Sequence, residues 1–415
     1  MQQKYWNMKH LLFIIISILL LTACEKDEIE QEIPIKRAVL IFMSAENNLS
    51  PYAQNDINEM ITGRKQVGND CDLLIYVDRA STKEKPFIAR INNDSQYPVD
   101  TLYIYPEDFY SSNPANFLDV MKRMVGFSPK AKEYGLVLWG HANGWILEND
   151  GNTVIRRAYG VDNGDNSSTL QVREPARWLN IPDMAKTFQQ LGIHWRFIFF
   201  DCCNMQNAEV AYELRNTTDY LIASPAEITG EGAPYDTMVK DFFIDDDEKM
   251  VMQMCIDYNA QFDYVGGHLP ISAVDVSKMQ ALADATKKIL PNIASYLKTN
   301  NPTQGIIYYY TFSHSDNEKI MYDMKDMIRT ALSEEPEKYK EWETVFYQAV
   351  IYAETSSKWH ALTIDFNDFE VTAEKFGGIS MFFPLDKYEK ASHPYKNDIK
   401  QMQWYQAVGW ASVGR

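Results

Sequence analysis

Short, uninterrupted apolar segments alternate with amphipathic segments along the first half of this 415-residue chain. Each apolar segment has the length of a strand that is buried on both faces, and the segments between them carry apolar residues at helical spacing. This alternation is typical of βαβ units, which build a parallel sheet with helices on both faces. We therefore predict an α/β fold with a mostly parallel central sheet, whose strands span residues 37–43, 71–77, 135–139, 195–200 and 220–224.

Helices are predicted between and after these strands. Ser50 and Asn113 are each followed by a proline, so that a capping residue precedes a proline at the first helical position. The pattern of the C-terminal part is more mixed. We predict helices at 50–63, from 113 onwards, and at 181–191, 204–214, 277–297 and 335–352, with further strands at 271–276 and 378–384.

The N-terminus has the features of a targeting signal. Two lysines precede an apolar run from Leu11 to Leu21, which is short for a membrane-spanning helix. Ala23-Cys24 follows, and a cysteine directly after small residues is the pattern of a bacterial lipobox. We predict a lipoprotein signal peptide at residues 1–23 and a lipid on Cys24 that anchors the protein to a membrane. The alternative is an ordinary signal peptide with a chance cysteine.

A polar, acidic segment at residues 24–36 is predicted to be a tether, because it is poor in core-forming side chains. It resembles the acidic stretch after the lipidated cysteine in surface-exposed lipoproteins of the Bacteroides group. That resemblance implies a lipid-anchored protein of the cell envelope, at the outer membrane and exposed at the surface. The remaining chain exceeds the size at which one core usually stops growing. We predict a main domain at 37–270 and a smaller C-terminal region at 271–415 that packs on it or extends it.

Charge and cysteine content narrow the classes of function. The formal net charge of −17 at pH 7 argues against binding of nucleic acid and is compatible with cationic substrates. The four cysteines after Cys24 are too few for a disulfide-stapled domain. Because no Cys-x-x-Cys, His-Glu-x-x-His or glycine-rich phosphate loop is present, we predict no metal and no cofactor, and the sequence leaves a Ca²⁺ requirement open.

Two predicted strands end close to reactive side chains. One ends two residues before His141, and another ends directly before Asp201-Cys202-Cys203. Ligands of open parallel sheets bind outside the carboxyl ends of the strands, where neighbouring strands lie about 4.8 Å apart. If these two strands are neighbours, the imidazole and a thiol can come within hydrogen-bond reach, as a cysteine nucleophile requires. Either residue alone would need no function, but their joint placement favours a catalytic pair.

The other histidines fit this geometry less well. His194 lies at the start of the strand that leads to Cys203, and therefore roughly 20 Å or more from the thiol. Four histidines in the C-terminal part follow no comparable strand end, and surface or structural positions are predicted for them: His268, His314, His360 and His393.

These features resemble the clostripain-like peptidases, a family of cysteine peptidases with the caspase/gingipain fold. The similarity lies in a strand that ends near a histidine, a second strand that ends in Asp-x-Cys, and an opening strand followed by Glu46-Asn47-Asn48-Leu49, where the family has an Asp-Asn-x-Leu turn. The resemblance implies a caspase-like α/β/α sandwich. It extends over most of the chain, with further similar segments at 209–214, 223–227, 232–235, 271–275 and 378–384.

The sequence departs from the family pattern at two places. Ala142 stands where the family usually has glycine, although a backbone N–H is still present there. Cys202-Cys203-Asn204 stands where the family has Ala-Cys-Leu. The Asp-x-Cys spacing of the family selects Cys203 as the nucleophile and puts Cys202 in place of a buried alanine.

The resemblance also implies roles for single residues. Cys203 would attack a peptide carbonyl as a thiolate, and His141 would promote that thiolate and protonate the leaving amine. Backbone N–H groups near Ala142 and of Cys203 would hold the oxyanion. The family prefers Arg or Lys before the scissile bond, which makes Asp201 and Glu231 the candidates for an acidic pocket. The predicted partners are therefore protein or peptide substrates with basic residues; for Glu231 a solvated loop carboxylate is the alternative.

Two further hypotheses concern activation and activity. Residues 149–180 form a long polar stretch between the histidine and cysteine strands. Family members can be activated by self-cleavage in such a loop, so we predict cleavage after Arg157, with a merely long loop as the alternative. Because Ala142 and the residues after Cys203 depart from the family pattern, a second function stays open: a catalytically inactive surface lipoprotein that binds a ligand or polypeptide on a peptidase-like scaffold.

Overall fold

The computed structural model of this chain describes residues 34–147, 158–164, 177–261, 269–309, 319–356, 360–361, 364–365, 370–391 and 394–414. The predictions for the signal peptide, for lipidation at Cys24 and for cleavage at Arg157 concern residues outside these ranges. Among the described residues, no helix combines the length and the apolar character that crossing a membrane requires.

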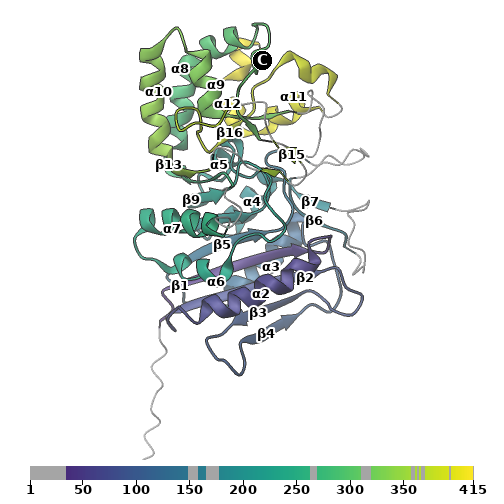
Figure 1. The fold of residues 1–415 in the computed structure, drawn as a ribbon. Helices are drawn as coiled ribbons and strands as arrows, with labels where there is room; N and C mark the ends of the chain where they lie inside the picture. The colour runs from purple at the N-terminus through teal and green to yellow at the C-terminus, as the bar shows by residue number, and fades with distance from the viewer. Residues whose placement is uncertain are drawn as a thin grey trace, which may run out of the picture. The chain divides into compact units, whose positions relative to one another are not determined.

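A nine-stranded sheet runs through the structure in the order β13-β10-β9-β8-β5-β1-β2-β3-β4 (Figure 1). Nearly all residues of the first two strands are buried, which explains why they appear in the sequence as uninterrupted apolar runs. All five strands predicted in the first half of the chain are present, each within two residues of its predicted ends. They form the parallel centre of the sheet: β9 (Thr218–Ala223), β8 (Trp195–Asp201), β5 (Glu133–Trp139), β1 (Arg37–Ala45) and β2 (Cys71–Arg79).

Antiparallel strands complete both edges of the sheet. On one side β10 (Ile271–Asp275) pairs with β9 and with β13 (Val350–Glu354). On the other side β3 (Phe87–Ile91) pairs with β2 and with β4 (Val99–Ile104). The β3–β4 hairpin is not predicted from the sequence, because β4 is largely exposed and has no apolar run. The region after residue 270 therefore extends the central sheet by two strands.

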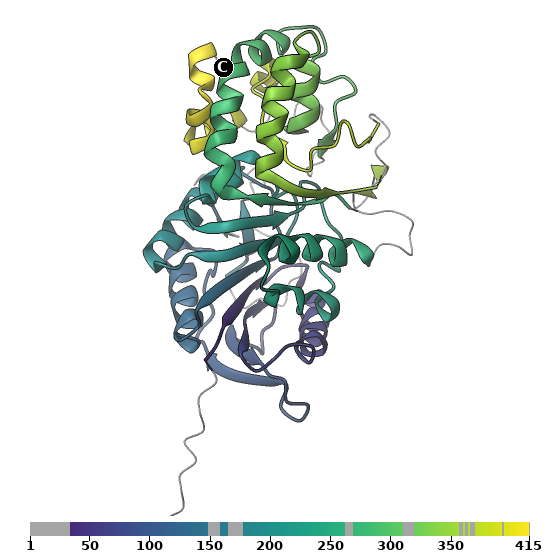
Figure 2. The same cartoon turned by 90° about the vertical axis from the view of Figure 1, so that its left-hand side faces the viewer.

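Helices cover both faces of the sheet, as the two views show (Figures 1 and 2). Three helices that contact one another lie on one face: α2 (Ser50–Arg64), α6 (Tyr235–Met238) and α7 (Asp247–Ala260). Three others lie on the opposite face: α3 (Pro114–Phe127), α4 (Ile181–Leu191) and α5 (Ala208–Leu214). The α/β/α sandwich predicted from the sequence is present.

The C-terminal part adds further helices and a small sheet. The long helix α8 (Met279–Tyr296) contacts α9 (Met324–Ala331), α10 (Pro336–Ala349) and α12 (Gln403–Val408), and α12 also contacts α5. A second sheet consists of β11 (Tyr308–Tyr309), β12 (Met321–Asp323) and β16 (Ser380–Met381). The remaining short elements are α11 (Tyr395–Asp398), β14 (His360–Ala361) and β15 (Ile364–Asp365).

Several predicted boundaries are wrong. Helix α5 begins at Ala208 rather than at 204, because the side chain of Asn207 accepts a hydrogen bond from the N–H of Val210 and caps the helix there. Helix α10 ends at Ala349, and the residues predicted as its last turn form β13. Those residues are β-branched and aromatic, which favours a strand.

Two segments differ more strongly from their prediction. The strand predicted at 378–384 is reduced to β16, which pairs with β12 in the second sheet and not with the central one. The polar stretch 149–180 contains two short strands among its described residues, β6 (Tyr159–Asp162) and β7 (Arg177–Leu179). Their apolar runs are too short to be detected in a polar sequence context.

Candidate active site

The strands that lead to His141 and Cys203 are neighbours in the sheet. Strand β5 pairs with β8 in parallel, and Trp139 lies opposite Asp201 in the register. The N–H of Gly140 donates to the carbonyl of Asp201 at 3.4 Å, so the pairing continues just past the strand ends. His141 and Cys203 each follow a member of the Trp139–Asp201 pair by two residues, and the predicted adjacency of the two strands is therefore present.

The loops after these two strands also lie against each other. Gly144 has a φ of +65°, a conformation that favours glycine. A Cβ at this position would lie 2.9 Å from the carbonyl oxygen of Asn204 and 2.7 Å from Nδ2 of Asn207. The turn after His141 thus passes directly over the residues that follow Cys203, and only a glycine fits there.

The two adjacent cysteines have different surroundings. The side chain of Cys202 is fully buried, and its Sγ donates to the carbonyl of Leu138 at 2.8 Å. Burial, with a smaller effect of Asp201, raises the pKa of the Cys202 thiol well above its usual value. Cys203 is 6% exposed, and its Sγ accepts a hydrogen bond from the N–H of Ile228 at 3.4 Å. A thiolate is therefore disfavoured at Cys202, whereas Cys203 has a donor that can stabilise one.

His141 is held by a side chain whose role is not predicted from the sequence. Its Nε2 lies 2.6 Å from Oδ1 of Asn48, which follows β1. Because an amide oxygen only accepts, the proton of this hydrogen bond belongs to Nε2. The turn at Glu46–Leu49, which resembles the family's turn, contains Asn48. Because β1 adjoins β5, this turn is the sequence feature that could have indicated Asn48 as the partner of His141.

The predicted oxyanion groups lie in the loop after β5 and at Cys203. Ala142 is fully buried and forms an isolated β-bridge with Tyr159. The N–H of Asn143 donates to the carbonyl of Ala158 at 2.9 Å, so this group is already engaged. The role of the Ala142 and Cys203 N–H groups stays a prediction.

Asp201 is a buried carboxyl with one satisfied oxygen. Its Oδ2 accepts from the N–H of Ala233 at 3.1 Å and from the hydroxyl of Tyr235 at 2.8 Å. Its Oδ1 is buried and has no hydrogen-bond partner among the residues that the structure describes. Burial raises the pKa of Asp201 to about 6, although these two hydrogen bonds lower it. Glu231 lies in the same loop, two residues before Ala233, and is exposed.

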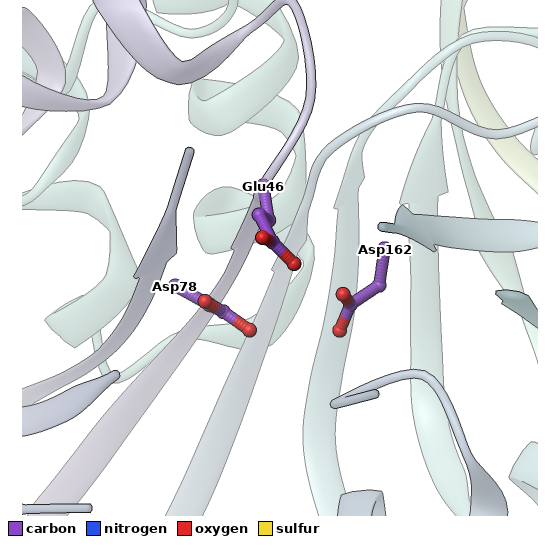
Figure 3. A group of neighbouring side chains, drawn as sticks. All are labelled: Glu46, Asp78 and Asp162. Carbon is purple, nitrogen blue, oxygen red and sulfur yellow. The ribbon is translucent and has the colours of Figure 1, made fainter. Parts of the chain in front are cut away.

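A second group of buried carboxyls lies near the ends of β1 and β2. The side chains of Glu46, Asp78 and Asp162 point toward one another, and one oxygen of each lies within 4.8 Å of the others (Figure 3). Burial, and then the neighbouring carboxyls, raise the pKa of Asp78 well above its usual value. Carboxylate oxygens in this arrangement are suitable ligands for a hard cation. Protons shared between the carboxyls are the alternative way to reduce their mutual repulsion. Among the described residues, this is the set that could hold a metal ion.

Hydrogen-bond donors surround that second group. The hydroxyl of Ser111 donates to Asp162 at 2.6 Å, and the hydroxyl of Tyr76 donates to Asp78 at 3.2 Å. The N–H of Gly164 donates to Asp162 at 2.7 Å and to Glu46 at 2.5 Å. Donors therefore meet each of the three carboxyls.

His194, which the strand geometry places far from the thiol, is exposed at the opposite end of β8. Its Nε2 lies 2.8 Å from Oδ1 of Asp219. This location agrees with the predicted place of His194 at the start of the strand, and its exclusion from the site stays a prediction.

A family model described as the clostripain family matches residues 41–413 of this chain. The chain belongs to that family. It is 28% identical over 228 residues to clostripain of Hathewaya histolytica, an alignment that covers 48% of this chain and 41% of that protein. The chain thus spans about two fifths of the length of the curated relative that it matches.

Solved structures of the family have the same fold. A secreted cysteine protease of Bacteroides thetaiotaomicron, solved in complex with an irreversible peptide inhibitor, superposes with a TM-score of 0.74 at 27% identity, covering 91% of this chain and 99% of that one. An inactive zymogen of a protease from Parabacteroides distasonis superposes with a TM-score of 0.70 at 24% identity, covering 90% and 97%. The family and the caspase-like fold class predicted from the sequence are confirmed, and the family is one of cysteine peptidases, as predicted.

Proposed function

We propose that this protein is a cysteine endopeptidase that cleaves after arginine or lysine, with Cys203 as nucleophile and His141 as its acid–base partner. One observation carries the assignment. His141 and Cys203 stand at matching positions past the paired ends of β5 and β8, and the loops after them are in contact. Of the two neighbouring cysteines, Cys202 is engaged with a carbonyl in the core.

The chemistry follows from these positions. Nδ1 of His141 takes the proton of the Cys203 thiol, and the thiolate attacks the carbonyl carbon of the scissile peptide bond. The negative charge that forms on the carbonyl oxygen is stabilised by the backbone N–H groups of Ala142 and Cys203. His141 then gives the proton to the leaving amine, and a water molecule hydrolyses the acyl-enzyme with the same histidine as base. Asn48 keeps the ring oriented through its hydrogen bond to Nε2.

The preference for basic residues is supported by the acidic groups beside the nucleophile. Asp201 precedes Cys203 by two residues and has a buried oxygen that lacks a partner among the described residues. Glu231 adds an exposed carboxylate in the loop that contacts Asp201. A positively charged side chain of the substrate would satisfy both groups.

Three further parts of the proposal concern maturation and location. We propose self-cleavage after Arg157 within residues 149–180, a lipid on Cys24, and attachment to the outer membrane with the enzyme exposed at the surface. Intact-mass spectrometry of the wild-type chain and of Cys203→Ala tests self-cleavage. The wild-type chain should appear as two fragments with a junction after Arg157, and identical intact chains in both samples would contradict it.

A fluorogenic assay with arginyl- and lysyl-amide substrates tests the proposed activity. The wild-type chain should turn over both substrates, and turnover should be lost in Cys203→Ala and in His141→Ala. Cys202→Ala is the matched control, because it removes the neighbouring thiol from the core and should retain activity. Absence of turnover in the wild-type chain would favour the alternative function, a binding protein on a peptidase-like scaffold.

A further inference from the structure

One face of α2 lies directly on the loop between β9 and α6. A Cβ on Gly230 would lie 2.9 Å from the ring of Tyr52, at the start of the helix. Two turns further on, the N–H of Tyr235 donates to Oε2 of Glu59 at 3.1 Å. A Cβ on Gly63 would lie 2.3 Å from the carbonyl oxygen of Tyr235, so helix and loop are in van der Waals contact there. This loop begins beside Cys203 and ends beside Asp201.

Asp56 lies on the same face of α2, between the contacts just described. It is 2% exposed, and its Oδ2 accepts a hydrogen bond from Nε1 of Trp139 at 2.6 Å. Trp139 is the residue of β5 that lies opposite Asp201 in the sheet. Asp56 is thus fixed beside the end of β5, next to the strand end that carries Asp201 and Cys203.

Asp56 and Asp201 influence each other electrostatically. Burial, and then the charge of Asp201, raise the pKa of Asp56 to about 8, whereas the hydrogen bond from Trp139 lowers it. Glu59 from the same helix and Glu231 from the loop raise it further. Among the residues that the structure describes, the groups with the largest effects on the pKa values of Asp56 and Asp201 include no lysine and no arginine.

Buried carboxyls are normally paired with a cation or fully hydrogen-bonded, because burial of an unpaired charge is costly. Here the second oxygen of Asp201 has no partner among the described residues, although the side chain is only 3% exposed. An orphaned buried acceptor beside a second buried carboxyl is the arrangement that a cationic ligand would complete.

We propose that Asp56 is a specificity-determining residue, which together with Asp201 binds the cationic side chain of the substrate residue before the scissile bond. The inference rests on the proposed function. It adds a residue of α2, more than a hundred residues before the nucleophile in the chain, to the acidic site proposed at Asp201 and Glu231. Glu231, which is exposed, stands at the outer side of this group. In the absence of a ligand the two buried carboxyls hold a proton, which the cation replaces.

Calorimetric titration of the full chain with agmatine tests the proposal, because agmatine carries a guanidinium group and has no scissile bond. Its neutral urea analogue is the control ligand. Asp78→Asn is the control variant, because it removes a buried carboxyl that belongs to the other group, with Glu46 and Asp162. We expect agmatine to bind the wild-type chain, to bind Asp56→Asn about 30-fold or more weakly, and to bind Asp78→Asn unchanged.

Proton release on the wild-type chain provides a second readout that needs no variant. With a pKa of about 8 for Asp56, agmatine binding at pH 7 should release about one proton, measured in buffers of different ionisation enthalpy. Equal agmatine affinity of the wild-type chain and Asp56→Asn, binding without proton release, or no binding to the wild-type chain would each overturn the proposal. Because turnover plays no part in this experiment, a wild-type chain that binds agmatine and cleaves no substrate would contradict only the proposed function.

Discussion

Two groups of buried carboxyls near the carboxyl ends of the central strands differ in how their oxygens are satisfied. The Asp56–Asp201 pair lies at the end of β8, close to Cys203, and one oxygen of Asp201 has no partner among the described residues. The cluster of Glu46, Asp78 and Asp162 receives hydrogen bonds from a serine, a tyrosine and a backbone N–H. Both groups have raised pKa values, because burial penalises the charged form in each.

Burial and raised pKa values therefore do not by themselves mark a binding site. A carboxyl cluster whose oxygens accept hydrogen bonds from the protein's own donors can serve only the fold. In the Asp56–Asp201 pair, Oδ1 of Asp201 has no such donor among the described residues. A cation from outside the protein can therefore form a favourable interaction there. The incomplete hydrogen bonding, together with the neighbouring Cys203, makes the first group the functional candidate.

The largest expected effect comes from Asp201→Asn. The exchange keeps the shape of the side chain but removes its charge, and loss of one partner of a buried charge pair costs about 100-fold or more in kcat/KM for an arginyl substrate. Asp78→Asn should stay within about twofold of the wild-type chain, because that carboxyl faces no substrate. Steady-state kinetics with one arginyl substrate gives kcat/KM for both variants. Equal losses in Asp201→Asn and Asp78→Asn would contradict the assignment of different roles to the two groups of carboxyls.

Asn48→Ala should have the next largest effect. Asn48 lies two residues after Glu46 and orients His141, so its loss should lower kcat about 10- to 100-fold with little change in KM. Asn48→Asp should restore much of the rate, because a carboxylate oxygen also accepts from Nε2. A loss confined to KM, or an equally inactive Asn48→Asp, would contradict a positioning role.

The pH dependence of stability should follow from the raised pKa values of the buried acids. Burial raises the pKa of Asp56 to about 8 and the pKa values of Asp241 and Glu209 to about 7. Between the usual range of a carboxyl and these values the folded chain binds more protons than the unfolded chain, so the free energy of unfolding falls as pH rises. Urea denaturation should give a stability at pH 6 that exceeds the value at pH 8 by about 1 kcal/mol or more. Asp56→Asn should reduce this difference, and a stability that rises over the same interval would contradict the assignment.

The smallest effect is expected for the stability of Asp78→Asn. Burial and the neighbouring carboxyls raise the pKa of Asp78, and the exchange replaces this carboxyl by a neutral amide of the same shape, for which burial costs less. The free energy of unfolding at pH 7 should change by less than about 1 kcal/mol. Denaturant unfolding measures this change, and a much larger loss would contradict a purely structural role in which burial disfavours the charged form of Asp78.

The centre of the sheet could be predicted from the sequence, but its edges could not. Strands β1, β2, β5, β8 and β9 are buried on both faces and appear as apolar runs. Strand β4 is mostly exposed and lacks such a run, and the end of α10 and the start of β13 share one continuous apolar pattern. In those places tertiary pairing, and not local pattern, determines the structure.

The candidate site was predictable to a similar degree. His141 and Cys203 follow directly from the ends of two apolar strands, and the family register separates Cys203 from Cys202. Asn48 and Asp56 could not be assigned, because their roles depend on where the turn after β1 and the face of α2 lie relative to β5 and β8. Only the packed structure supplies that information.

Covalent labelling tests the central assignment most directly. The wild-type chain is treated with an arginyl chloromethyl ketone, which alkylates a thiol beside a site for basic side chains, and peptide mass spectrometry then locates the adduct. We expect a single adduct on Cys203, which excess agmatine suppresses. An adduct on Cys202, or no adduct on either cysteine, would contradict it.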